Sequence, residues 1–115
     1  HGVNPAQETE RILREISLWK YRRVSPYKLS QGQQRCLGVA ALLAYDCDLL
    51  ICDEPTYAQD RSHTISIMEA LQDAVRKRGT TVIFSTHDNR LAEDYSDVQY
   101  IMKGGSLYEV HKSCM

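Results

Sequence analysis

The 115-residue sequence predicts an α/β fold organised around a parallel sheet. A short, continuously apolar run, Leu49 to Cys52, is typical of a strand that is buried on both faces. A helical pattern over about Ser62 to Lys77 follows it, and a β-branched and aromatic segment, Thr81 to Thr86, indicates a second strand. A strand, a helix and a strand joined by short links form a parallel βαβ unit, whose crossover is expected to be right-handed.

Two helices are expected ahead of this unit. Asn4 is an N-cap residue before a proline, which predicts a helix over about Pro5 to Tyr21. The Ser25-Pro26 pair favours an extended connection, because a residue before proline avoids the helical region. Ser30 is then placed to cap a second helix, about Gln31 to Tyr45.

The helix between the two strands has its own stop signal. Arg78-Gly79 supplies the cationic last turn and the glycine that commonly end a helix. Helical spacing predicts that four apolar side chains of this helix point inward: Ile65, Met68, Leu71 and Val75.

The last part of the chain predicts a short helix and a hairpin. The helix is expected over about Arg90 to Tyr95. Val98 to Met102 and Leu107 to Val110 are strand-like, and Gly104-Gly105 between them permits a tight turn.

Composition excludes several classes of protein. The chain has 14 Lys and Arg against 15 Asp and Glu, so its net charge of -1 does not predict a general nucleic-acid binder. No apolar run approaches the ~20 residues that span a bilayer, so we expect a soluble chain. Its cysteines form no CxxC pair, which predicts reduced thiols and neither zinc nor disulfides: Cys36, Cys47, Cys52 and Cys114. The start at His1 suggests a fragment or a processed chain.

Three side chains with useful chemistry follow the two strands. Asp53 and Glu54 end the first strand and His87 follows the second, and the carboxyl ends of parallel strands meet at one edge of a sheet. Asp53 can hold Mg²⁺, and Glu54, which we expect Pro55 to keep extended, can orient or deprotonate a water. His87 can bind a transferring phosphoryl oxygen or steady that water.

The turn at Ser30 to Gln33 is a candidate phosphate site. It begins a helix whose first backbone N–H groups and positive dipole end attract anions, and Gly32 lets an anion come close. Each motif also has a simpler interpretation when taken alone. The Ser30 turn can be an ordinary helix cap, Asp53-Glu54-Pro55 can be a strand-ending turn, and His87 can be a surface or core histidine.

Together, these residues resemble a known family. LSQGQ, Leu29 to Gln33, resembles the signature motif of ATP-binding-cassette (ABC) ATPases, and Leu49 to Glu54 resembles their Walker B strand with its catalytic glutamate. Tyr57 to Asp60 resembles their D-loop, and His87 matches their switch histidine. The stretch DEPTYAQD is similar to the form found in energy-coupling-factor ATPases, which power bacterial uptake of vitamins and metal ions.

The resemblance implies a P-loop NTPase-like sheet of which this chain carries the C-terminal half. Residues 1–45 correspond to part of the ABC helical subdomain with the signature motif, and 46–115 to the Walker B, D-loop and switch-histidine portion. No GxxxxGK[ST] phosphate loop occurs, so we expect the N-terminal half of the domain to be missing and the chain alone to be inactive. Gln31 and Ala58 replace glycines of the family motifs.

The resemblance also implies roles and partners. The complete domain would bind and hydrolyse ATP with Mg²⁺, using Glu54 and His87 as catalytic residues and Asp53 as the metal ligand. Two domains would pack head to tail, so that the signature residues contact the partner's ATP: Ser30, Gln31, Gly32 and Gln33. Asp60 is expected to belong to the nucleotide site, either supporting the residues that contact the ligand or at this dimer contact, or else simply to cap its loop, and the same alternatives stay open for Asp88.

The expected function is therefore that of the ATPase subunit or domain of a membrane transporter. It would drive transmembrane subunits from the cytoplasm, on the inner face of the membrane, and no nucleic acid is expected as a partner. One alternative is a soluble relative that repairs DNA or maintains chromosomes, although long coiled-coil heptads should then precede the signature. Another is a truncated, non-catalytic module that only binds a partner.

Overall fold

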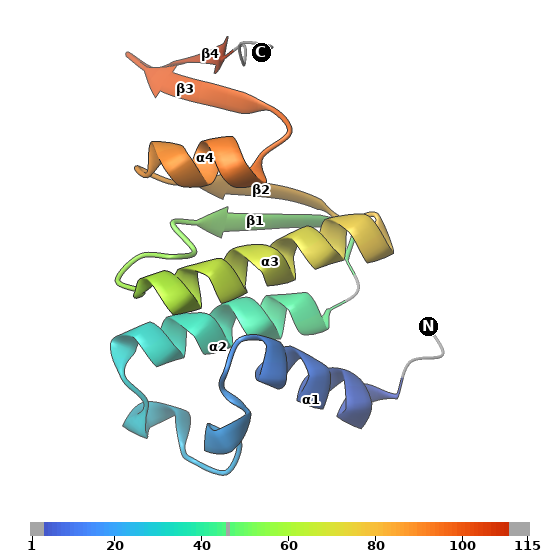
Figure 1. The fold of residues 1–115 in the computed structure, drawn as a ribbon. Coiled ribbons are helices and arrows are strands. Elements are labelled where there is room, and N and C mark those ends of the chain that lie inside the picture. The colour runs from blue at the N-terminus through green and yellow to red at the C-terminus, as the bar shows by residue number, and fades with distance from the viewer. Residues whose placement is uncertain (1–3, 46, 111–115) are drawn as a thin grey trace.

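The computed structural model describes residues 4–45 and 47–110; the expectations about His1 and Cys114 lie outside them. Within these residues a helical layer covers a parallel pair of strands, and an antiparallel hairpin lies at the far end (Figure 1). The helices are α1 (Pro5–Glu15), α2 (Gln31–Ala44), α3 (Arg61–Arg78) and α4 (Asn89–Tyr95), with 3₁₀ turns η1 (Trp19–Tyr21) and η2 (Pro26–Lys28). The strands are β1 (Leu49–Asp53), β2 (Thr81–Ser85), β3 (Gln99–Lys103) and β4 (Ser106–Val110).

The predicted βαβ unit is present. Strands β1 and β2 pair in parallel, in a register that runs from Leu49 opposite Thr81 to Asp53 opposite Ser85. The helix α3 connects them and lies between the strands and α2 (Figure 1). The fold class predicted from the sequence is therefore confirmed.

The prediction that β1 is buried on both faces is wrong for the described residues. Leu50 and Cys52 point into the core, but Leu49 and Ile51 on the other face are 49% and 68% exposed. Ile83 of β2 extends this exposed face. Because successive strand residues point to opposite faces, helices on one side bury only every second residue. The core consists of that covered face together with residues of α1, α2 and α3, with Ile16 and Leu18 after α1, and with Leu91 of α4.

The first helix begins as predicted and ends earlier than predicted. The Asn4 carboxamide oxygen accepts hydrogen bonds from the N–H groups of Ala6 and Gln7, at 2.9 and 3.3 Å. The helix stops at Glu15 because Ser17 adopts a left-handed conformation with φ of 63°. The Leu18 N–H then reaches back to the Leu13 carbonyl at 2.7 Å, which closes a Schellman-type end.

The connection between α1 and α2 is also more structured than predicted. Ser25 itself is extended, with ψ of 135°, as the following proline requires. Residues Pro26–Lys28 nevertheless form the turn η2, in which the Lys28 N–H donates to the Ser25 carbonyl at 2.9 Å.

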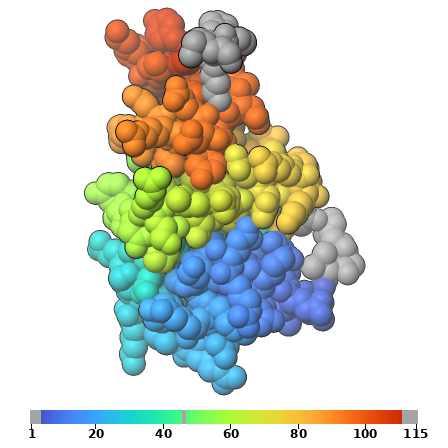
Figure 2. All heavy atoms as spheres, viewed as in Figure 1, coloured from blue at the N-terminus to red at the C-terminus, as the bar shows by residue number. Residues whose placement is uncertain are grey.

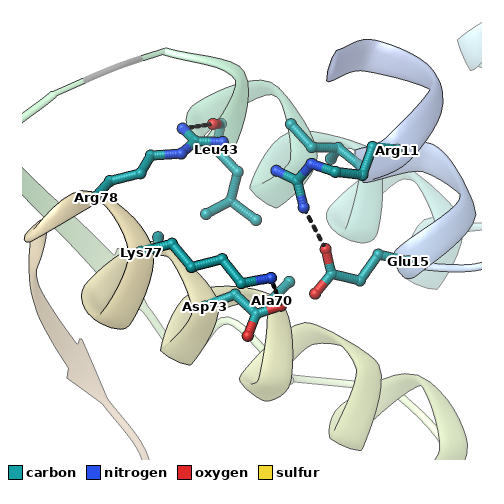
Figure 3. Close-up of a pocket in the computed structure, with 9 residues that line it drawn as sticks. Arg11, Glu15, Leu43, Ala70, Asp73, Lys77 and Arg78 are labelled. Carbon is teal, nitrogen blue, oxygen red and sulfur yellow. Dashed lines mark hydrogen bonds and ion pairs between the residues drawn. The ribbon is translucent and has the colours of Figure 1, made fainter. Parts of the chain in front are cut away.

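Arg78 joins the three helices at one end of the core. Figure 3 shows its guanidinium donating to the carbonyl of Leu43, at 2.7 Å. The Leu43 carbonyl lies in the last turn of α2, where carbonyl groups have no N–H partner within the helix. The same guanidinium pairs with Glu8 of α1. Next to this junction, Arg11 and Glu15 of α1 face Asp73 and Lys77 of α3 across a cavity of about 20 Å³, roughly one water in size (Figure 3).

The buried face of α3 differs from the prediction in part. Met68 and Leu71 are buried as predicted, whereas Ile65 and Val75 are partly exposed. The buried stripe instead includes Ile67 and two small residues, Ala70 and Ala74. Gly79 ends the helix in the left-handed conformation expected of it, with φ of 68°.

The short helix and the hairpin at the C-terminal end form as predicted, and most apolar side chains of the hairpin are exposed. Strands β3 and β4 pair with each other through a turn in which Gly104 and Gly105 both have positive φ, and they pair with neither β1 nor β2. In the space-filling view the hairpin, in red, stands beyond α4 at the end opposite the blue helical layer (Figure 2). Among the described residues, no helix is both long and apolar enough to cross a membrane.

Candidate functional site

A broad open groove lies where the two parallel strands end. Its volume is about 520 Å³, and polar side chains from the loops after β1 and β2 line it, with Glu54 and Thr56 on one side and Thr86, His87 and Asp88 on the other. The structure therefore brings together the residues that follow the two strands. This is the edge at which parallel α/β sheets bind ligands.

Asp53 is held in place by the neighbouring strand. Ser85, its partner in the β1–β2 register, donates its hydroxyl to Asp53 Oδ1 at 2.6 Å and accepts the N–H of Glu54 at 3.0 Å. Sequence reasoning did not single out Ser85. The sequence feature that could have identified Ser85 is its position at the end of the second strand. In a parallel pair in register, a hydroxyl at that position lies beside the acid that ends the first strand.

The oxygen atoms around Asp53 fit a hard cation such as Mg²⁺. A carboxylate with a hydroxyl beside it offers only oxygen donors, which Mg²⁺ prefers. No group of three or more His, Cys, Asp or Glu residues that can hold a metal occurs in the described part of the chain. Mg²⁺ at such a site takes its remaining ligands from water and phosphate, so one carboxylate is a sufficient protein contribution.

Glu54 does not have the extended backbone that was predicted from Pro55. Its φ is 49°, in the left-handed region that only glycine adopts without strain. Contacts on both sides of the residue hold it there: Ser85 accepts its N–H, and Arg35 donates to its carbonyl. The turn directs the carboxylate toward the groove, where Glu54 Oε1 lies 3.0 Å from His87 Nε2.

His87 is the more exposed residue of the Glu54–His87 pair. Its side chain is 97% exposed, whereas that of Glu54 is 25% exposed. The loop that carries His87 is fixed just beyond it, because the Asp88 N–H donates to Thr86 Oγ1 at 3.0 Å and Asp88 Oδ1 caps α4 through the Arg90 N–H. His87 can therefore reach a ligand in the groove while its backbone stays in place.

Arg35 is a site residue that sequence reasoning missed. From α2, its guanidinium donates to the carbonyl of Asp53 at 2.8 Å and to that of Glu54 at 2.7 and 3.0 Å. It also lies over the ring of Tyr57, 5.5 Å from the centroid. Arg35 is the single charged residue of α2, and this isolation within a small and apolar helix was the available signal.

Some polar groups of the turn from Ser30 to Gln33 already form hydrogen bonds within the turn. Ser30 Oγ accepts the Gln33 N–H at 3.1 Å, and Gln33 Oε1 accepts the Ser30 N–H at 3.0 Å. The predicted cap is thus a full capping box. The N–H groups of Gln31 and Gly32 have no hydrogen-bond partner among the described residues, so they remain available for an anion.

The loop after β1 packs against Gly32. A Cβ atom at this position would lie 3.4 Å from the side chain of Gln59 and 3.5 Å from the Ala58 carbonyl, which are ordinary van der Waals contacts, so packing within the chain does not itself require glycine here. The Gln59 amide donates to the Gly32 carbonyl at 2.7 Å, and Cys36 Sγ donates to the Gln59 carboxamide oxygen at 3.4 Å. The Ser30 turn therefore lies outside the groove and is joined to its rim through Gln59, which lines the groove.

Comparisons with known proteins place this arrangement in a family. The family described as ABC transporter matches residues 4–57, which include the Ser30 turn and the Asp53-Glu54 pair. The energy-coupling factor transporter ATP-binding protein EcfA2 of Methanospirillum hungatei is 36% identical over 101 residues, covering 88% of this chain and 25% of the relative. EcfA of Methanocaldococcus jannaschii is 33% identical over 107 residues, covering 90% and 38%.

Solved structures agree with the sequence comparison. An ATP binding subunit of an ABC transporter superposes with a TM-score of 0.77 at 26% identity, covering 92% of this chain and 45% of that one. The structure of cbiO1 from Clostridium perfringens, part of the ABC transporter complex cbiONQ, gives a TM-score of 0.71 at 27% identity, covering 90% and 41%. The chain belongs to the ABC ATPase family. It spans between 16% and 39% of the length of the curated relatives compared.

The loop that resembles the D-loop, Tyr57 to Asp60, keeps its backbone shape although it lacks the family's glycine. Ala58 stands where the family's D-loop has glycine, yet its φ of 62° keeps the left-handed backbone that glycine adopts readily. Asp60, at the end of that loop, caps α3 by accepting the His63 N–H at 2.8 Å and lies 2.9 Å from the His63 ring. These hydrogen bonds, the backbone one first, hold the pKa of Asp60 below its usual value.

Two buried thiols lie close to these ABC motifs. Burial raises the pKa of Cys36, on the signature helix, and of Cys52, on the Walker B strand. A raised pKa keeps a thiol protonated and unreactive, so both act as small packing groups, and the Cys36 thiol also donates to Gln59.

Proposed function

We propose that the protein containing this chain is an ABC ATPase of the energy-coupling-factor type, which hydrolyses ATP to power transmembrane transport. The observation that carries the proposal is the Glu54–His87 contact of 3.0 Å at the rim of the groove, next to Asp53 at the carboxyl edge of the sheet. An acid that can orient water, a histidine that can hydrogen-bond a phosphoryl oxygen and a carboxylate that can hold Mg²⁺ are groups that serve phosphoryl transfer to water, which depends on positioning and charge neutralisation. The names of the relatives, which are transport proteins, favour this function over DNA repair.

In this proposal the chain's residues divide the work. Glu54 orients and accepts a proton from the attacking water, and His87 donates a hydrogen bond to the transferring phosphoryl oxygen. Asp53, held by Ser85, is the ligand for Mg²⁺, which neutralises charge on the phosphates when bound. Thr86 and Asp88 shape the loop on which His87 lies.

The signature turn serves a second nucleotide, across a head-to-tail dimer. Ser30 to Gln33 lie outside the groove, and the N–H groups of Gln31 and Gly32 remain available for the phosphates of the partner's ATP. Asp60, which caps α3 and follows the Gln59 that bonds to Gly32, contributes to the dimer contact in this proposal. The partners are thus a second nucleotide-binding domain and transmembrane subunits, with no nucleic acid, and the location is the cytoplasmic face of the membrane. Residues 1–45 supply the helical subdomain and 46–115 the remainder.

The test of this function uses a complete domain. Because the chain spans part of its relatives, we would join it to the preceding region of the M. jannaschii EcfA protein to make a chimaera. In this chimaera Glu54→Gln should keep ATP binding and slow hydrolysis by about 100-fold or more, the usual effect of losing a general base. Measurement of ATP binding and of steady-state phosphate release checks both expectations.

The matched control is Glu69→Gln, on the exposed face of α3, which should leave both measurements unchanged. Hydrolysis near the parent rate in the Glu54→Gln chimaera would remove Glu54 from the proposed role. Loss of ATP binding in that variant would instead assign Glu54 a ground-state contact with the nucleotide.

A further inference from the structure

The segment between α1 and α2 carries an unbalanced positive charge. Residues 16–45, which comprise this segment, α2 and the residue after it, contain five Lys or Arg and no Asp or Glu, although the whole chain has a net charge of -1. One of the five, Arg35, is bonded to the end of β1. The other four are exposed and lie within residues 19–28, which we call the basic segment: Lys20, Arg22, Arg23 and Lys28.

No ion pair among residues 4–45 and 47–110 neutralises any of these four cations. The ion pairs among the described residues connect other groups, on α1, α3 and the groove, and none includes a cation of the basic segment. A cation that is exposed and unpaired keeps its attraction for an external anion. Four exposed cations within nine residues concentrate positive charge in one stretch of the chain, where their fields add.

Aromatic side chains are interleaved with these cations. The guanidinium groups of Arg14 and Arg22 both lie over the Trp19 ring, 4.8 and 4.4 Å from its centroid. Arg22 also donates to the Trp19 carbonyl at 3.2 Å, so its position is fixed. Tyr27, within η2, is 92% exposed. Cationic and aromatic side chains of this kind suit the boundary between water and lipid, where the rings lie at headgroup level.

The basic segment forms an open end of the molecule. In Figure 1 it is the blue-to-cyan stretch below α1 and α2, at the opposite end from the hairpin, and Figure 2 shows it on the surface there. Neither the cavity between α1 and α3 nor the groove at the strand ends includes a residue of the segment. A single small anion needs converging donors in a concave site, whereas an extended anionic surface needs only several exposed cations.

We propose that the basic segment binds anionic phospholipid headgroups at a membrane surface. The inference rests on the proposed function only in that a transporter ATPase works beside a membrane. Clusters of four or more Lys and Arg next to exposed aromatic groups bind anionic lipid through summed Coulomb attraction, which salt weakens. The contact would orient the helical layer toward the membrane and leave the groove and the Ser30 turn away from the lipid.

The experiment measures binding of the 115-residue chain to vesicles. Two compositions are used: phosphatidylcholine alone, and phosphatidylcholine mixed with phosphatidylglycerol in equal parts. We expect the chain to float with the anionic vesicles and not with the neutral ones. Binding should disappear at about 1 M salt, where charges more than about 3 Å apart are screened.

A pair of matched variants locates the contact. Lys20→Glu, Arg23→Glu and Lys28→Glu together reverse three charges and leave the Arg14–Trp19–Arg22 stack intact. This triple variant should bind anionic vesicles at least about 100-fold more weakly. The control, Arg61→Glu, Arg90→Glu and Lys103→Glu, changes net charge equally at exposed positions on α3, α4 and β3 and should keep most of the binding. Circular dichroism of both variants checks that each retains its helices.

Three outcomes would overturn the proposal. The first is equal binding to neutral and anionic vesicles, and the second is equal loss in the two triple variants. The third is binding of a fluorescent polyglutamate peptide without binding to anionic vesicles, which would assign the segment to an acidic protein partner. The vesicle assay contains no nucleotide and the hydrolysis assay contains no lipid, so failure of this proposal is distinguishable from failure of the proposed function.

Discussion

At the residue scale, three non-glycine residues in the described part of the chain hold left-handed backbone conformations that cost about 1–2 kcal/mol each. They are Ser17, Glu54 and Ala58, with φ of 63°, 49° and 62°. Ser17 ends α1, and the other two shape the turn between the strand end and α3. Strain of this kind persists only where surrounding contacts hold it, and at Glu54 those contacts are the hydrogen bonds from Arg35 and to Ser85.

Ala58 allows a direct measurement of this strain. Ala58→Gly removes the Cβ atom that disfavours positive φ and should raise the free energy of unfolding by about 1 kcal/mol. Urea unfolding of the chain, followed by circular dichroism, measures the change. Ala41→Gly is the control of opposite sign, because Ala41 is an exposed position inside α2 and glycine there should lower stability by about 1 kcal/mol. Destabilisation by Ala58→Gly would show that the Ala58 methyl group makes a contact worth more than the strain.

Arg35 gives a second prediction at this scale. Arg35→Ala removes three hydrogen bonds to the carbonyls of Asp53 and Glu54 and should lower the free energy of unfolding by about 2 kcal/mol. Arg35→Lys keeps the charge but not the planar fork, so it should recover only part of the stability. In the chimaera, both variants should reduce kcat more than they raise KM, because the Glu54 carboxylate loses its orientation. Unchanged kcat in Arg35→Ala would limit Arg35 to a structural role.

At the element scale, helix ends could be predicted from the sequence where a side chain or a glycine marks them. Ser30 caps α2 and Gly79 ends α3 as predicted. The end of α1 was missed because a serine, Ser17, occupies the left-handed position that glycine usually marks. The prediction of the inward face of α3 was partly wrong, because it counted large apolar residues only. The buried stripe includes the small residues Ala70 and Ala74.

The two roles of the Ser30 turn can be separated at this scale. Ser30→Ala removes the oxygen that accepts the Gln33 N–H and should cost about 1 kcal/mol of stability. Ser30→Asp keeps a capping oxygen and adds a charge that suits the positive helix end, so stability should be retained. The same negative charge repels phosphate, so the Ser30→Asp chimaera should fold normally and lose hydrolysis. Near-normal hydrolysis in Ser30→Asp would leave the turn with a capping role alone.

At the scale of the whole molecule, the groove could be predicted and its fine structure could not. Topology places the ends of β1 and β2 at one edge, where the sequence predicted Asp53, Glu54 and His87, and of these three Glu54 and His87 line the groove. The contributions of Arg35 and Ser85 depend on which elements pack together, and no local pattern encodes that. The exposed face of β1 and β2 was missed for a related reason. A continuous apolar run indicates that both faces of a strand can be buried, but it does not identify the segments that cover each face.

The final prediction concerns nucleotide binding by the whole chain. The groups present are the N–H donors of a helix start, the Asp53 carboxylate, the Glu54 acid and His87. Attraction of phosphate to an exposed helix end contributes about 0.3–1 kcal/mol, far below the ~8 kcal/mol that corresponds to a micromolar complex. The phosphate-gripping loop of P-loop proteins, GxxxxGK[ST], does not occur in the 115 residues. Calorimetric titration of the chain with Mg-ATP should therefore detect no micromolar site, whereas the chimaera with the M. jannaschii region should bind. A micromolar site with one ATP per chain would mean that the groove itself binds the phosphates strongly, without the loop.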